Sequence, residues 1–340
     1  MIRVETRGWR DAARFEGVAA AKRLHDQLDV ERRVLQSRDR YIDVFALIEE
    51  LGIFLLFEDL DDVLGFCLPH PKSGIMVTTR RSSDLQRYTG AHELGHNYME
   101  HRGSVDTKIM YRGTYASTQV PFEETAAEAF AAECLAPLWL IVDHLKRQKW
   151  TPKGHLRNYA VVYQLSLRLG ISYEATCIAL FTNDLINKST LAELQKHQPA
   201  VAKREALAGT SLCAGHADVW RLTLADTGLR LPCNSDDIFI LELPTGSPGA
   251  PVWDDSHLSL LPINIHPIEI EEHGVSDGIY KLCFTLQNKI KSEVELLVSV
   301  PSSYLIAPMP SNVFGVDLIP VGKETKGFSR ARLRILGISQ

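Results

Sequence analysis

Hydrophobic positions recur at helical spacing through most of the first 210 residues, with one interruption. The spacing predicts one or two helices over residues 10–37 and a helix over "RYIDVFALIEELG" that ends at Gly52. Three short apolar runs between turn residues then predict strands at "IFLLFED", "GFCLP" and "SGIMVTT". Helices are expected again over 82–102, over "PFEETAAEAFAAECLAP" with a break at Pro137, and across 152–207.

From about residue 215 the hydrophobic pattern becomes alternating. Segments such as "DIFILELP" and "SEVELLVSVP" are rich in β-branched residues and are separated by Gly, Pro and Asp, which is typical of strands. The sequence therefore predicts an α+β protein, with a mainly helical domain that holds a small sheet, followed by a β-rich, sandwich-like domain. "LRLGISYEATCIAL" has the form of a helix-turn-helix-like segment. The predicted boundaries are 1–150, 151–210 and 211–340.

Composition and charge narrow the classes of protein that fit this pattern. The 340 residues carry a net charge of −5, which argues against a general polyanion binder. The N-terminus "MIRVETRGWR" has no apolar core and does not resemble a signal peptide, and the longest apolar runs are too short to cross a bilayer. The six cysteines are scattered without a C-x-x-C pair, which is typical of a reducing compartment. We expect a cytoplasmic protein that does not associate with membranes.

The stretch "YTGAHELGHNYMEH" contains the clearest candidate chemistry. On a helix, His92 and His96 share one face, so that both imidazoles can bind one metal ion. Glu93 is rotated by about 100° around the helix, from where its carboxylate can reach a water on the metal. This is the H-E-x-x-H arrangement of zinc peptidases, in which the glutamate takes a proton from the water. The strand "SGIMVTT" just upstream is expected to offer an edge to an extended substrate.

A catalytic zinc ion also needs a third protein ligand and one open position. Glu124 is the best candidate, on the alanine-rich second helix, with Glu123 as the competing ligand. Glu128, four residues further on, is expected to accept a hydrogen bond from an imidazole N–H. Gly95 weakens the first helix by about 1 kcal/mol relative to Ala, which is reasonable if another group must approach its backbone closely. We expect His101 to lie on the surface at the end of the helix.

These residues resemble a known family, the ImmA/IrrE metallopeptidases. The similar segments are "GIMVTTRRSSDLQRYTGAHELGHNYMEHRG", "EETAAEAFAAECLAP" and "LSLRLGISYEATCIAL", within roughly residues 40–185. The resemblance implies that His92, His96 and Glu124 bind Zn²⁺ and that Glu93 is the catalytic base. The chain departs from the family at Glu128, where Asn or Asp is usual.

Members of this family are zinc-dependent endopeptidases that typically cleave a partner helix-turn-helix repressor and so derepress stress, prophage or mobile-element genes. The resemblance implies the same kind of substrate here. It does not cover the C-terminal half. A peptidase with an appended domain is similar to regulators found beside anti-phage signalling operons, CBASS among them, which implies a role in antiviral defence or the DNA damage response.

Two further features allow more than one interpretation. Cys213, in the linker "TSLCAGHAD", could occupy the open position on zinc and hold the peptidase inactive, with Cys67 as the other candidate, although a free thiol without this role is the simpler interpretation. The middle helices are basic and could contact DNA as an activator, although an ordinary solvated surface is the favoured interpretation of such charge. The cations are Lys146, Arg147, Lys149, Lys153, Arg157, Arg168, Lys188, Lys196, Lys203 and Arg204.

Two rival functions follow from these features. The first is a DNA-binding or sensor protein whose metal site is structural or vestigial. The complete His/Glu/His/Glu set argues against it, because closed structural zinc sites usually fill all four positions with Cys or His. The second is a less selective peptidase, such as a toxin or phage factor.

Overall fold

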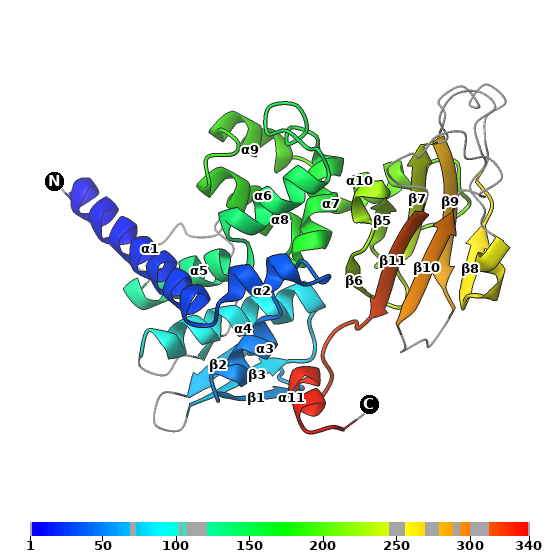
Figure 1. Ribbon diagram of the computed structural model, residues 1–340. Helices are drawn as coiled ribbons and strands as arrows, with labels where there is room; N and C mark the ends of the chain where they lie inside the picture. Colours follow the sequence, from blue (N-terminus) through cyan, green and yellow to red (C-terminus); the bar gives the residue numbers. More distant parts are fainter. Residues whose placement is uncertain are drawn as a thin grey trace.

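The structure is a computed structural model in which a helical part and a β-rich part lie side by side (Figure 1). It describes residues 2–68, 73–101, 105–106, 121–244, 256–268, 279–287, 293–299 and 313–338. The mixed helix-and-strand class predicted from the sequence is confirmed, with a helical N-terminal part and a β-rich C-terminal region.

The helical part combines a bundle of helices with one small sheet. Its strands are β1 (Phe54–Glu58), β2 (Gly65–Leu68), β3 (Gly74–Thr78) and β4 (Val105–Asp106). Its helices are α1 (Ile2–Gln27), α2 (Val30–Gln36), α3 (Val44–Glu50), α4 (Ser83–Tyr98), α5 (Phe122–Leu135), α6 (Leu138–Arg147), α7 (Tyr159–Leu169), α8 (Tyr173–Thr182), α9 (Lys188–Leu194) and α10 (Pro199–Ala206).

The small sheet has the strand order β12-β1-β3-β2-β4, in which β12 (Gly327–Phe328) comes from near the end of the chain, and α4 packs against β2 and β3. β3 is therefore an interior strand, parallel to β1 on one side and antiparallel to β2 on the other. The expectation that "SGIMVTT" offers a free edge to substrate is wrong, because both rows of its backbone groups are already paired. Ile75 and Val77 are both buried, as the interior position of the strand requires.

Proline sets the boundary between the two helices that follow. α5 ends at Leu135 and α6 begins at Leu138, directly after Pro137, because a residue before proline is disfavoured in helical conformation. Among the described residues, Phe122–Arg147 is the one stretch long and apolar enough to cross a membrane, and most of it is buried inside the protein. Most apolar residues of this stretch lie in the core of the helical part.

The β-rich part consists of two sheets around one shared core. Its elements are β5 (Val219–Leu222), η1 (Leu224–Asp226), β6 (Arg230–Cys233), β7 (Ile238–Pro244), η2 (Ser256–Leu260), β8 (Ile263–His266), β9 (Ile279–Leu286), β10 (Val294–Ser299) and β11 (Val313–Pro320). The strand orders are β10-β11-β6 and β5-β7-β9-β8. Phe239 and Phe284 stack in the core at a centroid distance of 5.1 Å, and Leu296 and Phe314 reach it from the other sheet.

A buried ion pair joins the β-rich part to α7. The Arg168 guanidinium donates from Nε and Nη2 to the two carboxylate oxygens of Asp226, at 3.0 and 2.9 Å. Both side chains are almost completely buried. Gln164, one turn earlier on α7, donates to the Val219 carbonyl and accepts from the Arg221 amide, each at 2.8 Å. The helix-turn-helix-like segment is therefore fixed to the first strand of the β-rich part.

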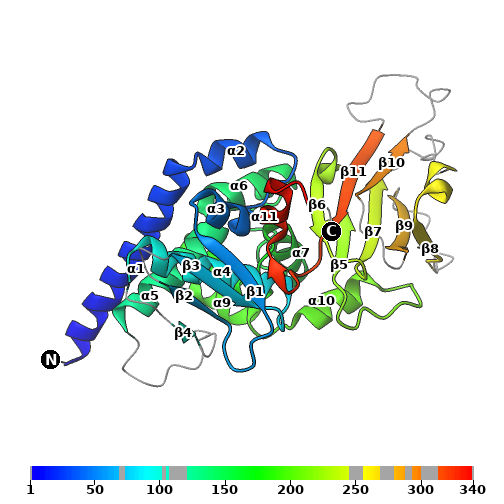
Figure 2. The same ribbon diagram turned by 90° about the horizontal axis from the view of Figure 1, so that it is seen from below.

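The end of the described chain returns to the helical part. β12 (Gly327–Phe328) pairs antiparallel with β1, and α11 (Arg330–Ile335) packs on α3 (Figure 2). The Ser329 hydroxyl donates to Glu49 at 2.9 Å. The sequence predicts one β-rich unit over residues 211–340, whereas their last segment extends the sheet of the helical part. A two-residue strand has no hydrophobic period from which it could have been predicted.

Candidate metal centre

Helix α4 places two buried imidazoles on one face. His92 and His96 are 5% and 1% exposed, and their Nε2 atoms lie 3.1 Å apart. This follows from their four-residue spacing, which sets side chains one above the other on a helix. Both ring nitrogens are directed to the same point, as a shared ligand would require.

Helix α5 brings a carboxylate to that point. The two oxygens of Glu124 lie 3.3 Å from His92 Nε2 and 3.5 Å from His96 Nε2. A tetrahedral ion with bonds of about 2.1 Å holds its ligand atoms about 3.4 Å apart, so the three groups fit a zinc-sized cation. Together they form a group of possible ligands within 4.8 Å of one another. Glu123, the competing candidate, is exposed and lies outside this group.

The electrostatics of Glu124 also suit a metal ligand. Burial by itself would raise the pKa of its carboxyl, but hydrogen bonds from His92 and His96 outweigh burial and hold the pKa well below its ordinary value. A carboxylate that stays ionised is the form that binds a metal.

Gly95 allows α4 and α5 to approach closely. A Cβ atom at this position would lie 3.0 Å from ring atoms of Phe130, which is fully buried on α5. Alanines 126, 127 and 131 of α5 are also fully buried, and the backbone of Ala126 lies against Gly17 of α1. The prediction that a group approaches the backbone of Gly95 is confirmed, and the group is an aromatic ring that packs the two metal-site helices together.

Glu93 lies on a different side of α4 from the converging nitrogens and is completely buried. A Cβ atom added at Gly65 of β2 would lie 3.3 Å from Glu93 Cγ, so the strand covers this side chain closely. Glu93 is not one of the three grouped residues, in keeping with a carboxylate that acts beside a metal rather than on it. Its role as a base stays a prediction.

His101 is only 8% exposed, so the expectation that it lies on the surface is wrong. Glu100 adopts a left-handed conformation with φ of 56°, and the His101 amide donates to the His96 carbonyl at 2.9 Å. The chain thus turns back after α4 and places His101 Nδ1 3.0 Å from His96 Nδ1. Residues that bond the outer nitrogen of a metal-binding histidine fix its orientation, and His101 holds that position here.

Glu128 lies one helical turn after Glu124 and is partly buried. With Tyr88 it lines a cavity of about 70 Å³ between α4, α5 and α8, whose other walls are mostly apolar. The predicted hydrogen bond from an imidazole to Glu128 stays a prediction. The cavity adds a feature that the sequence analysis missed, an apolar recess one turn from the grouped side chains.

The cysteines lie apart from the grouped side chains. Cys213 is exposed between α10 and β5, where its neighbours Leu212 and Ala214 pack against the second sheet. The structure does not bring it to the metal group, because these flanking residues are held elsewhere. Cys67 is buried on β2 and accepts a hydrogen bond from Asn97, and burial raises the pKa of its thiol to about 11.

Some of the cations that were candidates for a basic surface bind other groups of the same chain. Arg168 is buried against Asp226, Arg147 donates to carbonyls near η1, and Lys203 pairs with Asp218 at 3.1 Å. Helix α8, which would be the second helix of a helix-turn-helix, has the sequence "YEATCIALFT" and contains no Lys or Arg. These contacts give the segment a structural role in joining the two parts of the molecule.

A helix with H-E-x-x-H, a glutamate from the next helix and a sheet packed on the same helix define a metallopeptidase-like domain. Residues 48–181 match the family model described as Peptidase_M78, IrrE N-terminal-like domain. This segment belongs to the ImmA/IrrE family, as its motifs predicted. The match covers less than half of the chain and none of the β-rich part. No curated protein matches the chain.

Proposed function

We propose that the protein is a zinc-dependent endopeptidase that cleaves a specific partner protein, a helix-turn-helix transcriptional repressor. The observation that supports this most strongly is the convergence of two imidazoles and a carboxylate at spacings suited to zinc, on the helix that also carries Glu93. The peptidase family of residues 48–181 supports the reaction class. The repressor as substrate rests on the family resemblance alone.

The chemistry assigns distinct roles to the side chains. When bound, zinc would polarise the scissile carbonyl and lower the pKa of the attacking water. His92, His96 and Glu124 would hold the ion, and His101 would keep the His96 ring in position. Glu93 accepts the proton of the water and then delivers it to the leaving amine. The apolar recess beside Tyr88 would receive a hydrophobic side chain of the substrate.

The free thiols support the same cellular setting. All six cysteines are free, and all except Cys213 are buried. Unpaired cysteines are usual in a reducing compartment, so we place the activity in the cytoplasm.

The test of this function is direct proteolysis. The zinc-loaded chain is incubated with a candidate helix-turn-helix repressor, taken from a neighbouring gene where one is present, and with an unrelated protein such as casein. Cleavage of the first at one site, lost with a chelator and restored by zinc, is the expected result. Cleavage of both proteins would favour a less selective peptidase. Intact proteins in every reaction would contradict the proposal.

Binding to DNA is the rival function, and the contacts of the basic residues give it little support. Electrophoretic shift with duplex and single-stranded DNA, in zinc and in chelator, separates the two. A shift that persists without zinc in a chain that cleaves nothing would favour a DNA-binding protein with a vestigial metal site.

A further inference from the structure

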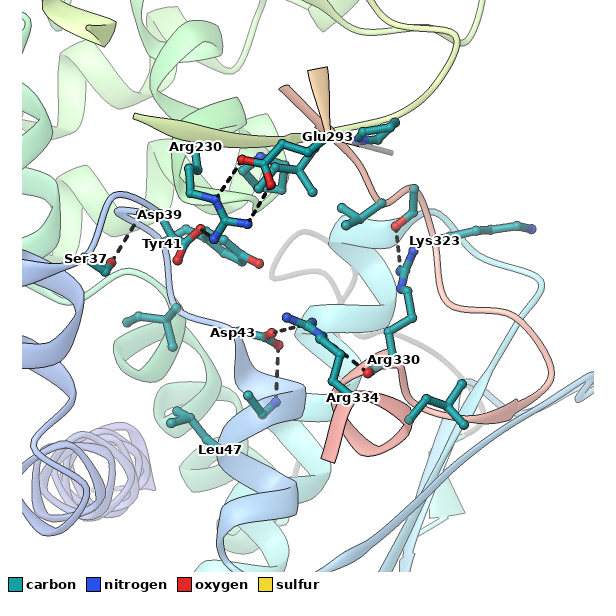
Figure 3. Close-up of a pocket in the computed structure, with 18 of the residues that line it drawn as sticks. Ser37, Asp39, Tyr41, Asp43, Leu47, Arg230, Glu293, Lys323, Arg330 and Arg334 are labelled. Atoms are coloured by element: carbon teal, nitrogen blue, oxygen red, sulfur yellow. Dashed lines mark hydrogen bonds and ion pairs between the residues drawn. The ribbon is translucent and has the colours of Figure 1, made fainter. Parts of the chain in front are cut away.

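A large cavity opens where three parts of the chain meet. Its volume is about 1080 Å³, and a ligand pocket is typically about 300–1000 Å³. Its walls come from the α2–α3 region, from the ends of β6 and β11, and from the segment 322–338 that returns to the helical part (Figure 3). The three grouped metal-site residues are not among its lining residues, so it is a separate site.

The chemistry of the walls is mixed in a way that restricts the ligand. Among the described lining residues, five are cations and three are anions, but Arg33 and Arg330 already pair with Glu50 and Glu324. Arg334 and Lys323 are therefore the cations available to an acidic ligand. The three carboxylates would repel a bare polyanion but can accept hydrogen bonds from hydroxyl groups. The cations are Arg33, Arg230, Lys323, Arg330 and Arg334, the anions are Asp39, Asp43 and Glu293, and the apolar wall includes Val30, Val34, Ala46, Leu47, Leu333 and Ile338.

Arg334 is the guanidinium with the weakest hold on its own partners, and Lys323, the other available cation, donates to the Thr79 carbonyl at 2.9 Å. Its side chain is 70% exposed, with Asp43 at 3.6 Å and the Arg330 carbonyl at 3.4 Å. Arg230 is held more tightly, since it donates to Asp39 at 2.9 Å and to Glu293 at 3.2 Å. A guanidinium with unused donors is a suitable group for two oxygens of a phosphate.

Tyr41 adds a hydroxyl donor to the same space. Figure 3 shows the Tyr41 ring beside Arg230, with its oxygen directed to the open side. Burial and the neighbouring Asp43 raise the pKa of Tyr41 to about 12, so the hydroxyl stays protonated at neutral pH. The cavity thus combines guanidinium groups, the Tyr41 hydroxyl, carboxylates that can accept hydrogen bonds from a ligand's hydroxyl groups, and an apolar wall.

We propose that this cavity binds a nucleoside phosphate. Its phosphate would contact Arg334, its ribose hydroxyls would donate to the carboxylates, and its base would lie on the apolar wall. A simple phosphate would leave the wall and the carboxylates unused, and a nucleoside without phosphate would leave the guanidinium unused. The ligand would make contacts with all three parts of the chain at once.

The cavity is connected to the metal-site helix through rigid contacts. Gln86 of α4, which is 1% exposed, accepts from the Glu324 amide at 2.8 Å and donates to its carbonyl at 3.1 Å. The neighbours of Glu324, Lys323 and Thr325, line the cavity. Arg87 of α4 donates to the carbonyl of Ile42, a lining residue, at 2.8 Å. We therefore expect occupancy of the cavity to change the restraints on the helix that carries His92 and His96.

The binding part of this inference is independent of peptidase activity, and only the effect on catalysis rests on the proposed function. Binding is measured by titration calorimetry on the full, zinc-loaded chain with AMP, adenosine and inorganic phosphate. We expect AMP to bind at least about tenfold more tightly than either fragment, because each fragment forgoes one set of contacts.

Arg334→Gln should weaken AMP binding by about tenfold or more, the loss expected for one charged hydrogen bond. Arg332→Gln is the matched control, because Arg332 lies on the same helix, pairs with Glu49 and does not line the cavity. Absence of AMP binding, or equal binding to the Arg334→Gln variant and the wild type, would overturn the proposal.

The connection to the metal site has a separate readout, amide hydrogen exchange along α4. AMP should slow exchange in α4 of the wild-type chain, and Arg334→Gln should need an AMP concentration about tenfold higher or more for the same effect. If AMP protects residues around the cavity and leaves α4 unchanged, the cavity is a binding site without influence on the metal centre. A chain that binds AMP but cleaves no protein would contradict the proposed function and leave the binding site in place.

Discussion

The candidate metal centre and the large cavity are built in opposite ways. The metal group comes from two consecutive helices, α4 and α5, and its three side chains occur between residues 92 and 124. The cavity gathers residues from 30–47, 230–235, 293 and 319–338. The first depends on the period of a helix, whereas the second depends on how distant parts of the chain pack together.

This difference explains why one site carries a motif and the other does not. Residues four apart on a helix share a face whatever the rest of the molecule does. Residues hundreds of positions apart meet only after the sheet of β6 and β11 and the returning C-terminal segment are in place. We therefore expect the metal centre to depend on single side chains, and the cavity on the contacts that join the parts.

The largest expected effect is at Glu93. Glu93→Gln keeps the size of the side chain but removes its ability to accept a proton, and should slow cleavage by about 10²–10⁴-fold. Zinc content should stay the same, because Glu93 is not in the group of ligands. The measurement is the rate of fragment formation together with metal analysis. A variant that cleaves at the wild-type rate would show that Glu93 is not the base.

The next largest effect tests how the two parts are joined. Arg168→Met leaves Asp226 buried without its ion-pair partner and should lower the free energy of unfolding by about 3–5 kcal/mol. Arg221→Met is the control, since its partner Glu242 is shared with Lys281 and its own side chain is 43% exposed. The control should change stability by about 1 kcal/mol or less. Urea unfolding of the full chain that gives equal losses for both variants would contradict this account of the junction.

His101→Leu should have a smaller effect, at the metal centre. It removes the nitrogen that contacts His96 Nδ1 and should weaken zinc binding by about 10–100-fold. Competition with a chromophoric chelator gives the affinity. His155→Leu, at an exposed histidine after α6, is the control and should bind zinc as the wild type does. Unchanged affinity in His101→Leu would mean that the contact does not orient His96.

The smallest effect concerns pH and the packing of buried histidines. Desolvation lowers the pKa of His25 and of His144 to about 4, whereas an unfolded chain binds a proton at each near 6.5. Between these values the unfolded state holds more protons, so stability is lost as the pH falls from about 6.5 towards 4. Each histidine contributes a slope of up to about 1.4 kcal/mol per pH unit.

His144→Gln should reduce this slope by the share of one histidine, because Gln binds no proton in this pH range. The variant should still fold, since Gln can donate to the Arg40 carbonyl that His144 now contacts. Denaturant unfolding at several pH values between 4 and 7 gives the slope. His155→Gln should leave it unchanged. A His144→Gln variant with the full slope would place the pH dependence at other groups.

Sequence reasoning recovered the elements whose pattern is local. The helices around His92 and Glu124 follow from helical spacing, and the close approach at Gly95 follows from the cost of glycine in a helix. His101 was missed because its position depends on the reversal at Glu100, which no hydrophobic period signals. The interior position of β3 has a local sign that was overlooked, since "GIMV" is apolar on both faces.

The arrangement of the parts could not be predicted from the sequence. The pairing of β12 with β1 is made by two residues near the end of the chain, Gly327 and Phe328. The ion pair of Arg168 and Asp226 joins positions that no local pattern connects. The subgroup beside anti-phage operons also stays a prediction, because the family match ends at residue 181.

The most direct test of the metal centre is the zinc content of the purified full chain by mass spectrometry, compared between Glu124→Ala and Glu123→Ala. The group of His92, His96 and Glu124 predicts one tightly bound zinc ion per chain in the wild type and in Glu123→Ala, and a large loss in Glu124→Ala. A wild-type chain that retains no zinc after it has been supplied, or equal zinc in both variants, would contradict the account.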